Sequence, residues 1–447
     1  MVSIIGHDES PVSRLRACLD RIGRPSGEGA RACVAVYEER AMAEAEAAAA
    51  RRRLGLSVGS LDGVIVSVKD LFDVAGEVTR AGSALLHGEG KVADGDAVAV
   101  RRLRAAGAVI VAKTNMSELA FSGVGTNPHL GTPANPLDRS RIPGGSSSGA
   151  AVAVADGFCD IAIGTDTGGS IRIPSALCGL VGFKPTQARV PRDGAFPLSP
   201  TLDSVGPIAR SVAQCVAADG VLSGDSRPVA PVPLDGLRLG IVAGIPFNDI
   251  EPEIDAAFQA AISALREAGV RAVPVEIPQI EAMRQLNART GGIVAAEAHA
   301  LHQARAARFG EMDPNIATRI EKGAAIPAAD YIELLEGRRR LADELAGLWE
   351  RFDVLAMPTV PIAAPSLSEV ADPDRFNDRN LMLLRNTAIG NFFDWPAISL
   401  PVRSGATVAG LSILARPNAD RRLLAIAASA EKALDERSIL FRHGDAS

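Results

Sequence analysis

Apolar positions along the chain alternate between helical spacing and short continuous runs. Residues 11–22 and 38–53 have helical spacing, and the second segment is rich in Ala, Glu and Arg, which favour helices. Residues 64–70, VIVSVKD, form a β-branched run that predicts a buried strand. Residues 96–107 predict an amphipathic helix, and residues 108–115, AVIVAKTN, predict a second buried strand. This alternation predicts a layered α/β fold with parallel strands, whose active sites gather at the carboxyl ends of the strands.

The alternation of predicted helices and strands continues through most of the remaining chain. Residues 281–351 are the exception, since their pattern is mostly helical. The last of these helical patterns covers residues 330–352. Earlier in the chain, residues 123–142 are dense in Gly, Pro and Asn, which predicts an ordered loop. Further strands are predicted at 161–165, 180–185, 236–242, 271–277, 353–359 and 396–402, and further helices at about 148–156, 251–269 and 418–434.

Both early strands end at a lysine, Lys69 in the first and Lys113 in the second. Of the 47 lysines and arginines only six are lysines, so a lysine at a buried strand end stands out. Burial can lower the pKa of a lysine until the neutral amine acts as a base, whereas arginine stays charged. A structural ion pair or a side chain reaching solvent is the alternative for each. The strand pattern does not choose between the two lysines.

Two serines, Ser146 and Ser170, each follow a pair of glycines within residues 143–186. Glycine lets the backbone turn sharply and approach another molecule closely. Successive N–H groups in such a turn can converge on one point, as an oxyanion hole for a serine nucleophile requires. A phosphate-binding loop or a tight structural turn is the alternative. The converging N–H groups would come from Thr167, Gly168, Gly169 and Ser170.

Other nucleophiles and ligand pairs fit the sequence less well. Ser147 has the G-x-S-x-G pattern of an α/β-hydrolase elbow, but a loop rather than a strand precedes it. Ser429 and Lys432 have the spacing of a penicillin-binding motif within a predicted closing helix. Cys178 lies in SALCGLVG, which favours packing of a small apolar side chain. His299-x-x-His302 is half of a metal pattern without a completing carboxylate motif.

Composition narrows the class of protein and the compartment. The chain of 447 residues is 47% hydrophobic and 22% charged, which is typical of a globular protein. Its net charge of −6 argues against nucleic-acid binding as the main activity. The five cysteines lack metal-ligand spacing and predict reduced thiols. With no signal-like N-terminus and no membrane-length apolar run, a cytoplasmic location is expected, with no membrane partner.

The stretch GGSSSGAAVAVADGFCDIAIGTDTGGSIRIPSALCG resembles the signature of the amidase signature family almost position by position. Six further motifs extend the resemblance over nearly the whole chain, apart from about 281–350. The resemblance implies the amidase signature fold, a large mixed, mostly parallel central sheet covered by helices on both faces. It also implies one domain over residues 1–447, with a signature core at about 60–215 and a helical, substrate-shaping elaboration at about 281–351. The motifs are VSVKDLFDVAG, GAVIVAKTNMSELA, GTNPHLGTPANP, LVGFKPT, LDSVGPIARSV and PAISLPV.

Carried over from the family, Ser170 is the nucleophile, Ser146 relays its proton from beside a cis peptide bond, and Lys69 is the base. This choice leaves Lys113 a structural role near the site. The oxyanion hole is expected from residues 167–170. Supporting residues are Ser147, Asp166 and Arg172, of which the last two are expected to brace the nucleophile loop. The aromatic side chains of residues 392, 393 and 395 favour an apolar or aryl acyl group, and ordinary core packing is the alternative for them. The expected substrate pocket contains Met116, Gly125, Phe196, Phe392, Phe393 and Trp395.

The resemblance implies hydrolysis of a C–N acyl bond in a small amide, anilide or carbamate through a seryl acyl-enzyme at Ser170. No cofactor and no metal ion is expected. The alternative is a glutamine-hydrolysing subunit of an amidotransferase that is inert without its partners. A more remote alternative is an esterase of the α/β-hydrolase type with Ser147 as nucleophile. A homodimer is one option for the assembly, and no nucleic-acid partner is expected.

Overall fold

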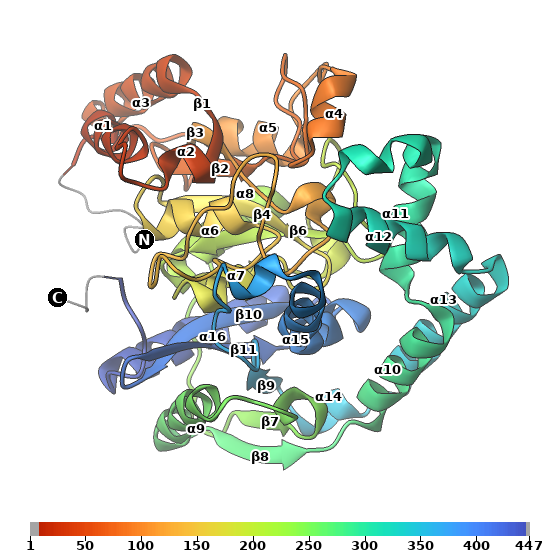
Figure 1. Ribbon diagram of the computed structural model, residues 1–447. Helices are drawn as coiled ribbons and strands as arrows, with labels where there is room; N and C mark the ends of the chain where they lie inside the picture. Colours follow the sequence, from red (N-terminus) through yellow and green to blue (C-terminus); the bar gives the residue numbers. More distant parts are fainter. Residues whose placement is uncertain (1–8, 444–447) are drawn as a thin grey trace.

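The computed structural model describes residues 9–443, which are organised around a mixed 11-stranded sheet (Figure 1). The predicted large mixed sheet is confirmed, but the expectation that it is mostly parallel is corrected, because antiparallel pairs outnumber parallel pairs among the described strands. Parallel pairs join β2 to β3 and β4, and β7 to β8 and β9, whereas the remaining neighbours are antiparallel. The order is β1-β3-β2-β4-β6-β5-β10-β11-β9-β7-β8, with β1 Cys33–Val36, β2 Ile65–Lys69, β3 Val109–Thr114, β4 Ile161–Asp166, β5 Val181–Lys184, β6 Ser204–Ala209, β7 Arg238–Val242, β8 Arg271–Val275, β9 Val354–Pro358, β10 Ala397–Ser404 and β11 Thr407–Leu414.

Helices cover both faces of this sheet because each presents a buried apolar side to it. On one face, α5 (Val98–Ala105), α8 (Val212–Ser223), α9 (Pro252–Glu267) and α16 (Asp420–Glu436) contribute to the largest apolar core. On the other face, α6 (Ser148–Ala155) packs on β2, β4 and β6. The remaining helices of this side are α7 (Arg172–Leu177), which packs on β5, β10 and β11, and the N-terminal α1 (Pro11–Ile22), α2 (Gly29–Ala32) and α3 (Glu38–Arg53).

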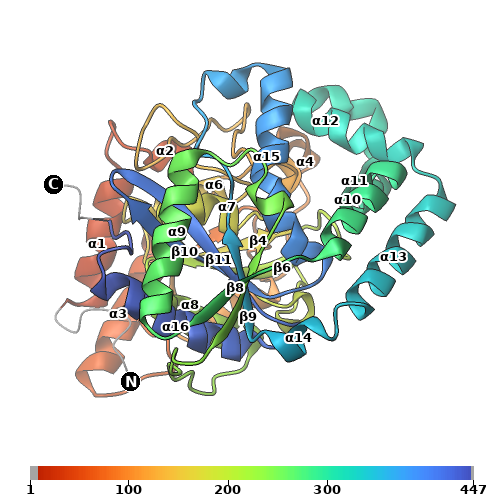
Figure 2. The ribbon, with the colours of Figure 1, turned by 90° about the horizontal axis from the view of Figure 1, so that it is seen from below.

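Residues 278–351 form a helical segment, where the sequence predicts mostly helix over about 281–351. Figures 1 and 2 both show α10, α11, α12 and α13 together at one side of the molecule, outside the sheet layers. This helical segment meets the rest of the protein beside α15 (Pro373–Phe392) and the loop after β3. Its members are α10 Pro278–Thr290, α11 Ile293–His302, η4 Gln303–Glu311, α12 Pro314–Glu321, η5 Lys322–Ala325, α13 Ala328–Asp343 and α14 Leu348–Arg351.

Several elements are absent from the sequence-based prediction. Strand β6 contains Gly206 and Pro207, which disfavour strands, yet it pairs with both β4 and β5. Helix α15 is rich in polar residues, so its apolar spacing is weak, although Asp372 caps its first turn and Pro373 occupies the first helical position. Strands β1 and β11 and the short helix α4 (Ala84–Glu89) were also not predicted.

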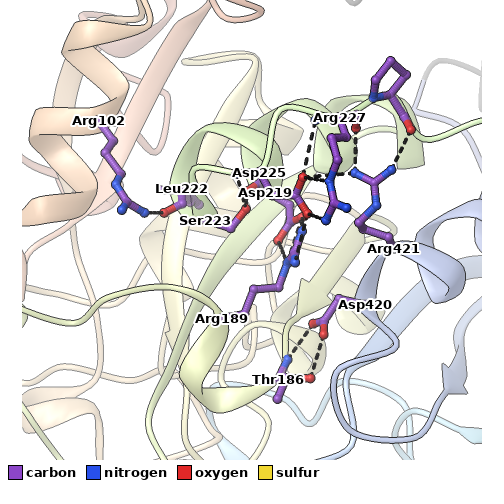
Figure 3. A network of polar contacts seen from close by, with 11 residues as sticks. Arg102, Thr186, Arg189, Asp219, Leu222, Ser223, Asp225, Arg227, Asp420 and Arg421 are labelled. Atoms are coloured by element: carbon purple, nitrogen blue, oxygen red, sulfur yellow. Dashed lines mark hydrogen bonds and ion pairs between the residues drawn. The ribbon is translucent and has the colours of Figure 1, made fainter.

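Polar contacts fix the segment that follows β5 (Figure 3). Asp420 accepts hydrogen bonds from the backbone N–H and the hydroxyl of Thr186, both at 2.7 Å. Arg189 forms an ion pair with Asp219 of α8 at 2.6 Å, and Arg421 of α16 lies 3.2 Å from Asp225. This network joins α8 and α16 on one face of the sheet. Within residues 9–443, no helix combines the length and apolar character that crossing a membrane requires.

Candidate active site

Lys69 is the last residue of β2 and is fully buried, next to the segment that contains Ser146. Its Nζ donates hydrogen bonds to Oγ of Ser146 at 2.7 Å and to Oγ1 of Thr165 at 3.0 Å. Thr165 lies on the neighbouring strand β4, and Ser146 lies just before α6. The lysine is therefore held between a strand and the start of a helix.

Ser146 occupies a tight backbone site that only glycine neighbours permit. The peptide bond between Gly145 and Ser146 is cis, as the family resemblance implies. The N–H of Gly145 donates to the carbonyl of Gly123 at 2.8 Å. Gly125 has a φ of 93°, and a Cβ there would collide with the backbone of Gly144. Gly125 thus shapes the loop that holds Ser146.

Ser170 lies in the loop between β4 and α7, next to Ser146 in space. The N–H of Ser147 donates to the carbonyl of Ser170 at 3.3 Å, which ties the two serine segments together. The hydroxyls of Ser146 and Ser170 are not hydrogen-bonded to each other among the contacts of the described chain.

The backbone around Ser170 is arranged to bind negative charge. Within residues 9–443, no group accepts a hydrogen bond from the backbone N–H of residues 167–170. Gly169 has a φ of 140°, and a Cβ at this position would overlap the side chain of Thr387. The Thr387 hydroxyl donates to the carbonyl of Gly168 at 2.5 Å, which fixes the peptide orientation of the loop. Free N–H groups in a fixed turn are what an oxyanion hole requires.

A buried ion pair joins the two ends of residues 166–172, the loop that carries Ser170 and that the sequence predicts as the nucleophile loop. Arg172 and Asp166 are fully buried, and Nη2 of the arginine lies 2.9 Å from Oδ1 of the carboxylate. The same carboxylate accepts from the backbone N–H of Ile171 at 3.2 Å. Asn391 of α15 accepts from Arg172 at 2.7 Å and donates to Asp166 at 2.9 Å. The pair thus braces the loop, as the sequence analysis expects of Asp166 and Arg172.

Burial sets the electrostatics of this centre. Burial lowers the pKa of Lys69 to about 7, against the attraction of Asp166 and Asp203. Although burial opposes it, the Arg172 guanidinium holds the pKa of Asp166 at about 2. Burial raises the pKa of Asp203 to about 6, against hydrogen bonds that include one from the Thr167 hydroxyl at 2.5 Å. Lys69 is therefore substantially neutral near pH 7, while Asp166 stays ionised.

A cavity of about 570 Å³ opens beside Ser170. The nucleophile loop and the loop after β3 form one side, and α15 together with the helical segment of residues 278–351 forms the other. Most of the wall is apolar, which suits a small organic molecule. The lining residues are Ala120, Phe121, Ser122, Thr167, Gly168, Ser170, Leu198, Leu202, Met283, Asn287, Gly291, Gly292, Ile293, Val294, Ala295, Arg319, Lys322, Asn377, Leu381, Leu384, Ala388, Asn391 and Phe392.

The predicted pocket residues are only partly brought to this cavity. Phe392 lines it, and Phe196 lines a neighbouring cavity of about 290 Å³ that also reaches Thr165. Phe393 and Trp395 do not line it, because they stack on each other in the core with ring centroids 4.9 Å apart. Met116 is also a core residue and Gly125 supports the Ser146 loop, so neither borders the cavity. The expectation of an aromatic pocket is therefore corrected: of the expected pocket residues, Phe392 alone lines the cavity beside Ser170.

The alternative nucleophiles lie away from the cavity wall. The hydroxyl of Ser147 is buried and donates to the carbonyl of Thr165 at 3.4 Å. Cys178 is buried, and burial raises the pKa of its thiol. Ser429 donates to the carbonyl of Val232 at 2.6 Å. In the described part of the chain, no three His, Cys, Asp or Glu side chains gather as a metal site would need, and His299 and His302 lie on α11.

Several residues of this centre escaped the sequence analysis. Thr165, Thr387 and Asn391 hold the lysine and the nucleophile loop, and Asn391 lies inside GNFFDWP, where the aromatic residues drew attention instead. Arg319 and the neighbouring cavity wall belong to the helical segment, where no motif marks them. The fold, rather than a local motif, brings Arg319 of α12 and the residues of α15 to the cavity that Ser170 also lines.

Known proteins resemble this chain in sequence and in fold over most of its length. The family model described as Amidase matches residues 14–424. A 2-amino-5-chloromuconic acid deaminase from Comamonas testosteroni is 37% identical over 385 residues, covering 84% of this chain and 83% of the relative. A glutamyl-tRNA(Gln) amidotransferase subunit from Acidothermus cellulolyticus is 35% identical over 471 residues, covering 95% of this chain and 91% of the relative. A crystal structure of an amidase superposes with a TM-score of 0.83 at 31% identity, covering 96% of both chains.

Proposed function

The chain belongs to the amidase family, a group of hydrolases that act on C–N bonds, and we propose that it cleaves a small-molecule amide through a seryl acyl-enzyme at Ser170. One observation carries this proposal: a fully buried lysine, Lys69, donates at 2.7 Å to Ser146 directly behind the nucleophile loop. The free N–H groups of residues 167–170 and the adjoining cavity support it.

Acylation begins when Oγ of Ser170 attacks the carbonyl carbon of the amide. Its proton passes to Oγ of Ser146 as the Ser146 proton passes to the neutral Nζ of Lys69. The carbonyl oxygen becomes an oxyanion, which the N–H groups of residues 167–170 would bind. When the intermediate collapses, the C–N bond breaks, and the proton returns from Lys69 through Ser146 to the leaving nitrogen. The amine departs neutral and the acyl group remains as an ester.

Deacylation uses the same groups in the reverse order. Water attacks the ester carbon and gives its proton to Lys69 through Ser146. When the second intermediate collapses, the bond between the ester carbon and Oγ of Ser170 breaks and the proton returns from Lys69 through Ser146 to that oxygen. The carboxylic acid is released. The pKa of Lys69, which burial lowers to about 7, lets the amine both take and return a proton near neutral pH.

The proposal is tested by labelling the purified chain with a fluorophosphonate and mapping the modified peptide. We expect the label on Ser170 and none on a Ser170→Ala variant, which should also lose amide hydrolysis. Ser429→Ala is the matched control. Ser429 lies on α16, its hydroxyl donates to the carbonyl of Val232, and it does not line the cavity. A label on Ser147 or Ser429, or full activity of Ser170→Ala, would overturn the assignment.

A second candidate is a glutamine-hydrolysing subunit of an amidotransferase. The similarity to a subunit of a glutamyl-tRNA(Gln) amidotransferase over 95% of this chain favours it. The two candidates differ in their dependence on partners, because a free-standing amidase should be active alone. We expect the purified chain to hydrolyse simple amides without added protein. Hydrolysis confined to glutamine and dependent on other subunits would favour the second candidate.

Carbamates and anilides fall within the first proposal, because their carbonyl carbons can be attacked in the same way. Turnover of acetanilide, an aliphatic amide, an aryl carbamate and glutamine by the purified chain would rank these classes.

A cytoplasmic location is supported by the five cysteines, all of which are buried and free. A homodimer stays a prediction, which the molecular mass in solution will test. The name of the deaminase relative specifies an acid as its substrate, which makes acidic amides worth including.

A further inference from the structure

The charged groups on the cavity wall have one sign. Arg319 and Lys322 both line the cavity beside Ser170, whereas no aspartate or glutamate is part of that lining. Both come from the helical segment, Arg319 from α12 and Lys322 from η5, while Ser170 comes from the loop after β4. The wall between them is mostly apolar. The cavity thus joins a serine hydroxyl, an apolar middle and two cations.

Arg319 is held in place but lacks a polar partner. Its guanidinium carbon lies 4.7 Å from the centroid of the Phe121 ring, which is itself part of the cavity wall. Its Nε is buried and donates to no group within residues 9–443, and no carboxylate there pairs with the side chain. Burial lowers the pKa of Arg319 to about 10, so the guanidinium remains charged at neutral pH. The aromatic contact fixes the cation and leaves its N–H donors unused.

Neighbouring arginines of the same helical segment behave differently. Arg305 pairs with Glu89 at 2.8 Å, and Arg308 pairs with Glu311 at 2.7 Å. The Arg319 side chain is partly exposed, with its Nε buried, and leaving such a charge without a partner is costly. A ligand that supplies the opposite charge would offset that cost. Arg319 therefore has the character of a ligand-binding group rather than of a structural ion pair.

An anionic ligand suits Arg319 best, because it both accepts from the unused N–H groups and balances the charge. A carboxylate matches a guanidinium fork through two parallel hydrogen bonds. The lack of acidic side chains on the wall disfavours a ligand that also carries an ammonium group, such as glutamine. An ω-amide of a dicarboxylic acid fits all three features: an amide for Ser170, an apolar chain, and a carboxylate for the cations.

We propose that Arg319, assisted by Lys322, binds a carboxylate of the substrate remote from the scissile bond, so that the enzyme acts on half-amides of dicarboxylic acids. This inference rests on the proposed function, because it assigns the substrate class of the same cavity. Arg319 is then a specificity-determining residue. It selects the substrate and takes no part in the proton transfers.

The first test compares acids with neutral amides of equal length on the unmodified full-length chain. The half-amides of succinic, glutaric, adipic and pimelic acid are paired with the corresponding diamides. We expect kcat/KM for the best half-amide to exceed that of its diamide at least tenfold, and the ratio to fall as salt is raised. A diamide preference at every length would overturn the inference.

The second test changes the cation. Arg319→Met should lower kcat/KM for the best half-amide about 10- to 100-fold more than for its diamide, since charge-assisted hydrogen bonds are lost. Lys322→Met should lower the same ratio less, because Lys322 is exposed. Arg308→Met is the matched control, since Arg308 lies in the same segment but outside the cavity, and it should leave the ratio unchanged. Equal losses for acid and diamide in Arg319→Met would overturn the inference.

A third measurement keeps the inference testable if Arg319→Met fails to fold. Glutarate and adipate should protect Ser170 of the unmodified chain from fluorophosphonate labelling, whereas the corresponding diols should not. Equal protection by both would overturn the carboxylate site. The failure of the proposed function looks different, because Ser170 would then not be labelled at all and no amide would be hydrolysed. Labelling with turnover of neutral amides alone would retain the function and reject this inference.

Discussion

Two buried lysines, on adjacent parallel strands, have different surroundings. Lys69 ends β2 and donates to the hydroxyls of Ser146 and Thr165. Lys113 lies near the end of β3, where its Nζ has no hydrogen-bond partner within the described chain and lies 3.7 Å from Glu77. Lys69 thus contacts two hydroxyl groups, whereas Lys113 faces a small cavity of about 150 Å³ with Asp70 and Glu77. Burial alone therefore does not mark a base.

The register of the sheet explains this difference. Lys69 pairs with Thr114, while Lys113 pairs with Val68, so the two lysine side chains leave opposite faces of the sheet. On the Lys69 face, α6 brings Ser146 over the strand ends. The face of Lys113 instead meets the segment after β2. A lysine becomes a candidate base only on the face where the serine segments lie.

The comparison predicts its largest effect for removal of the amine from Lys69. Lys69→Met should lower kcat/KM for amide hydrolysis about 10³-fold, since general-base catalysis is lost. Lys113→Met is the matched control and should lose less than about tenfold. Steady-state kinetics of both variants on one amide provide the measurement. If the two losses were equal, the distinction between the lysines would fail.

The pH dependence is the next largest effect. The neutral amine of Lys69 is the active form, so kcat/KM should fall about tenfold for each pH unit below its pKa. Because burial lowers that pKa to about 7, activity should rise with pH and level off above about 7. The profile of kcat/KM from pH 5 to 9 provides the measurement, and Lys113→Met should keep the same midpoint. A midpoint that moved with Lys113 would make that residue part of the proton relay.

The sequence predicts both strands and both lysines but not which face each lysine takes. The pairing of β2 with β3 shifts in register between Val66 and Ser67, and this irregularity depends on tertiary packing. Lys184 is a third buried lysine at a strand end, where it ends β5 and donates to the carbonyl of Pro185. Its strand pattern did not mark it as a candidate base. The family resemblance, rather than strand periodicity, selected Lys69.

The cavity was less predictable than the relay, for a similar reason. Phe393 and Trp395 are conspicuous in the sequence, but the end of α15 turns them into the core, and Phe392 alone among these three reaches the cavity. Arg319 is one arginine in an arginine-rich chain, and its lack of a partner follows only from how α12 packs. Short motifs encode the catalytic loops locally, whereas the substrate wall is assembled from distant segments.

Lys113 should matter more for stability than for catalysis. Lys113→Met removes a cation beside Glu77 and Asp70, and the Asp70 carboxylate is buried with Oδ1 unpaired. We expect a loss of about 1–3 kcal/mol in the free energy of unfolding, because the buried Asp70 and the partly exposed Glu77 lose their balancing charge. The midpoint of urea unfolding at constant pH provides the measurement. An unchanged midpoint would mean that Lys113 does not stabilise this side of the sheet.

The smallest effect sharpens the comparison at the Lys69 end. Thr165→Val keeps the volume of the side chain but removes the hydroxyl oxygen that accepts from Nζ of Lys69 at 3.0 Å. That bond favours the charged amine, so its loss should lower the Lys69 pKa further and move the midpoint of the kcat/KM profile to lower pH. We expect a shift of a few tenths of a pH unit and a loss of about threefold at the plateau, since the amine is held by Ser146 alone. A shift to higher pH would mean that the Thr165 hydroxyl donates to a neutral amine, and that the relay is oriented by Thr165 as well as by Ser146.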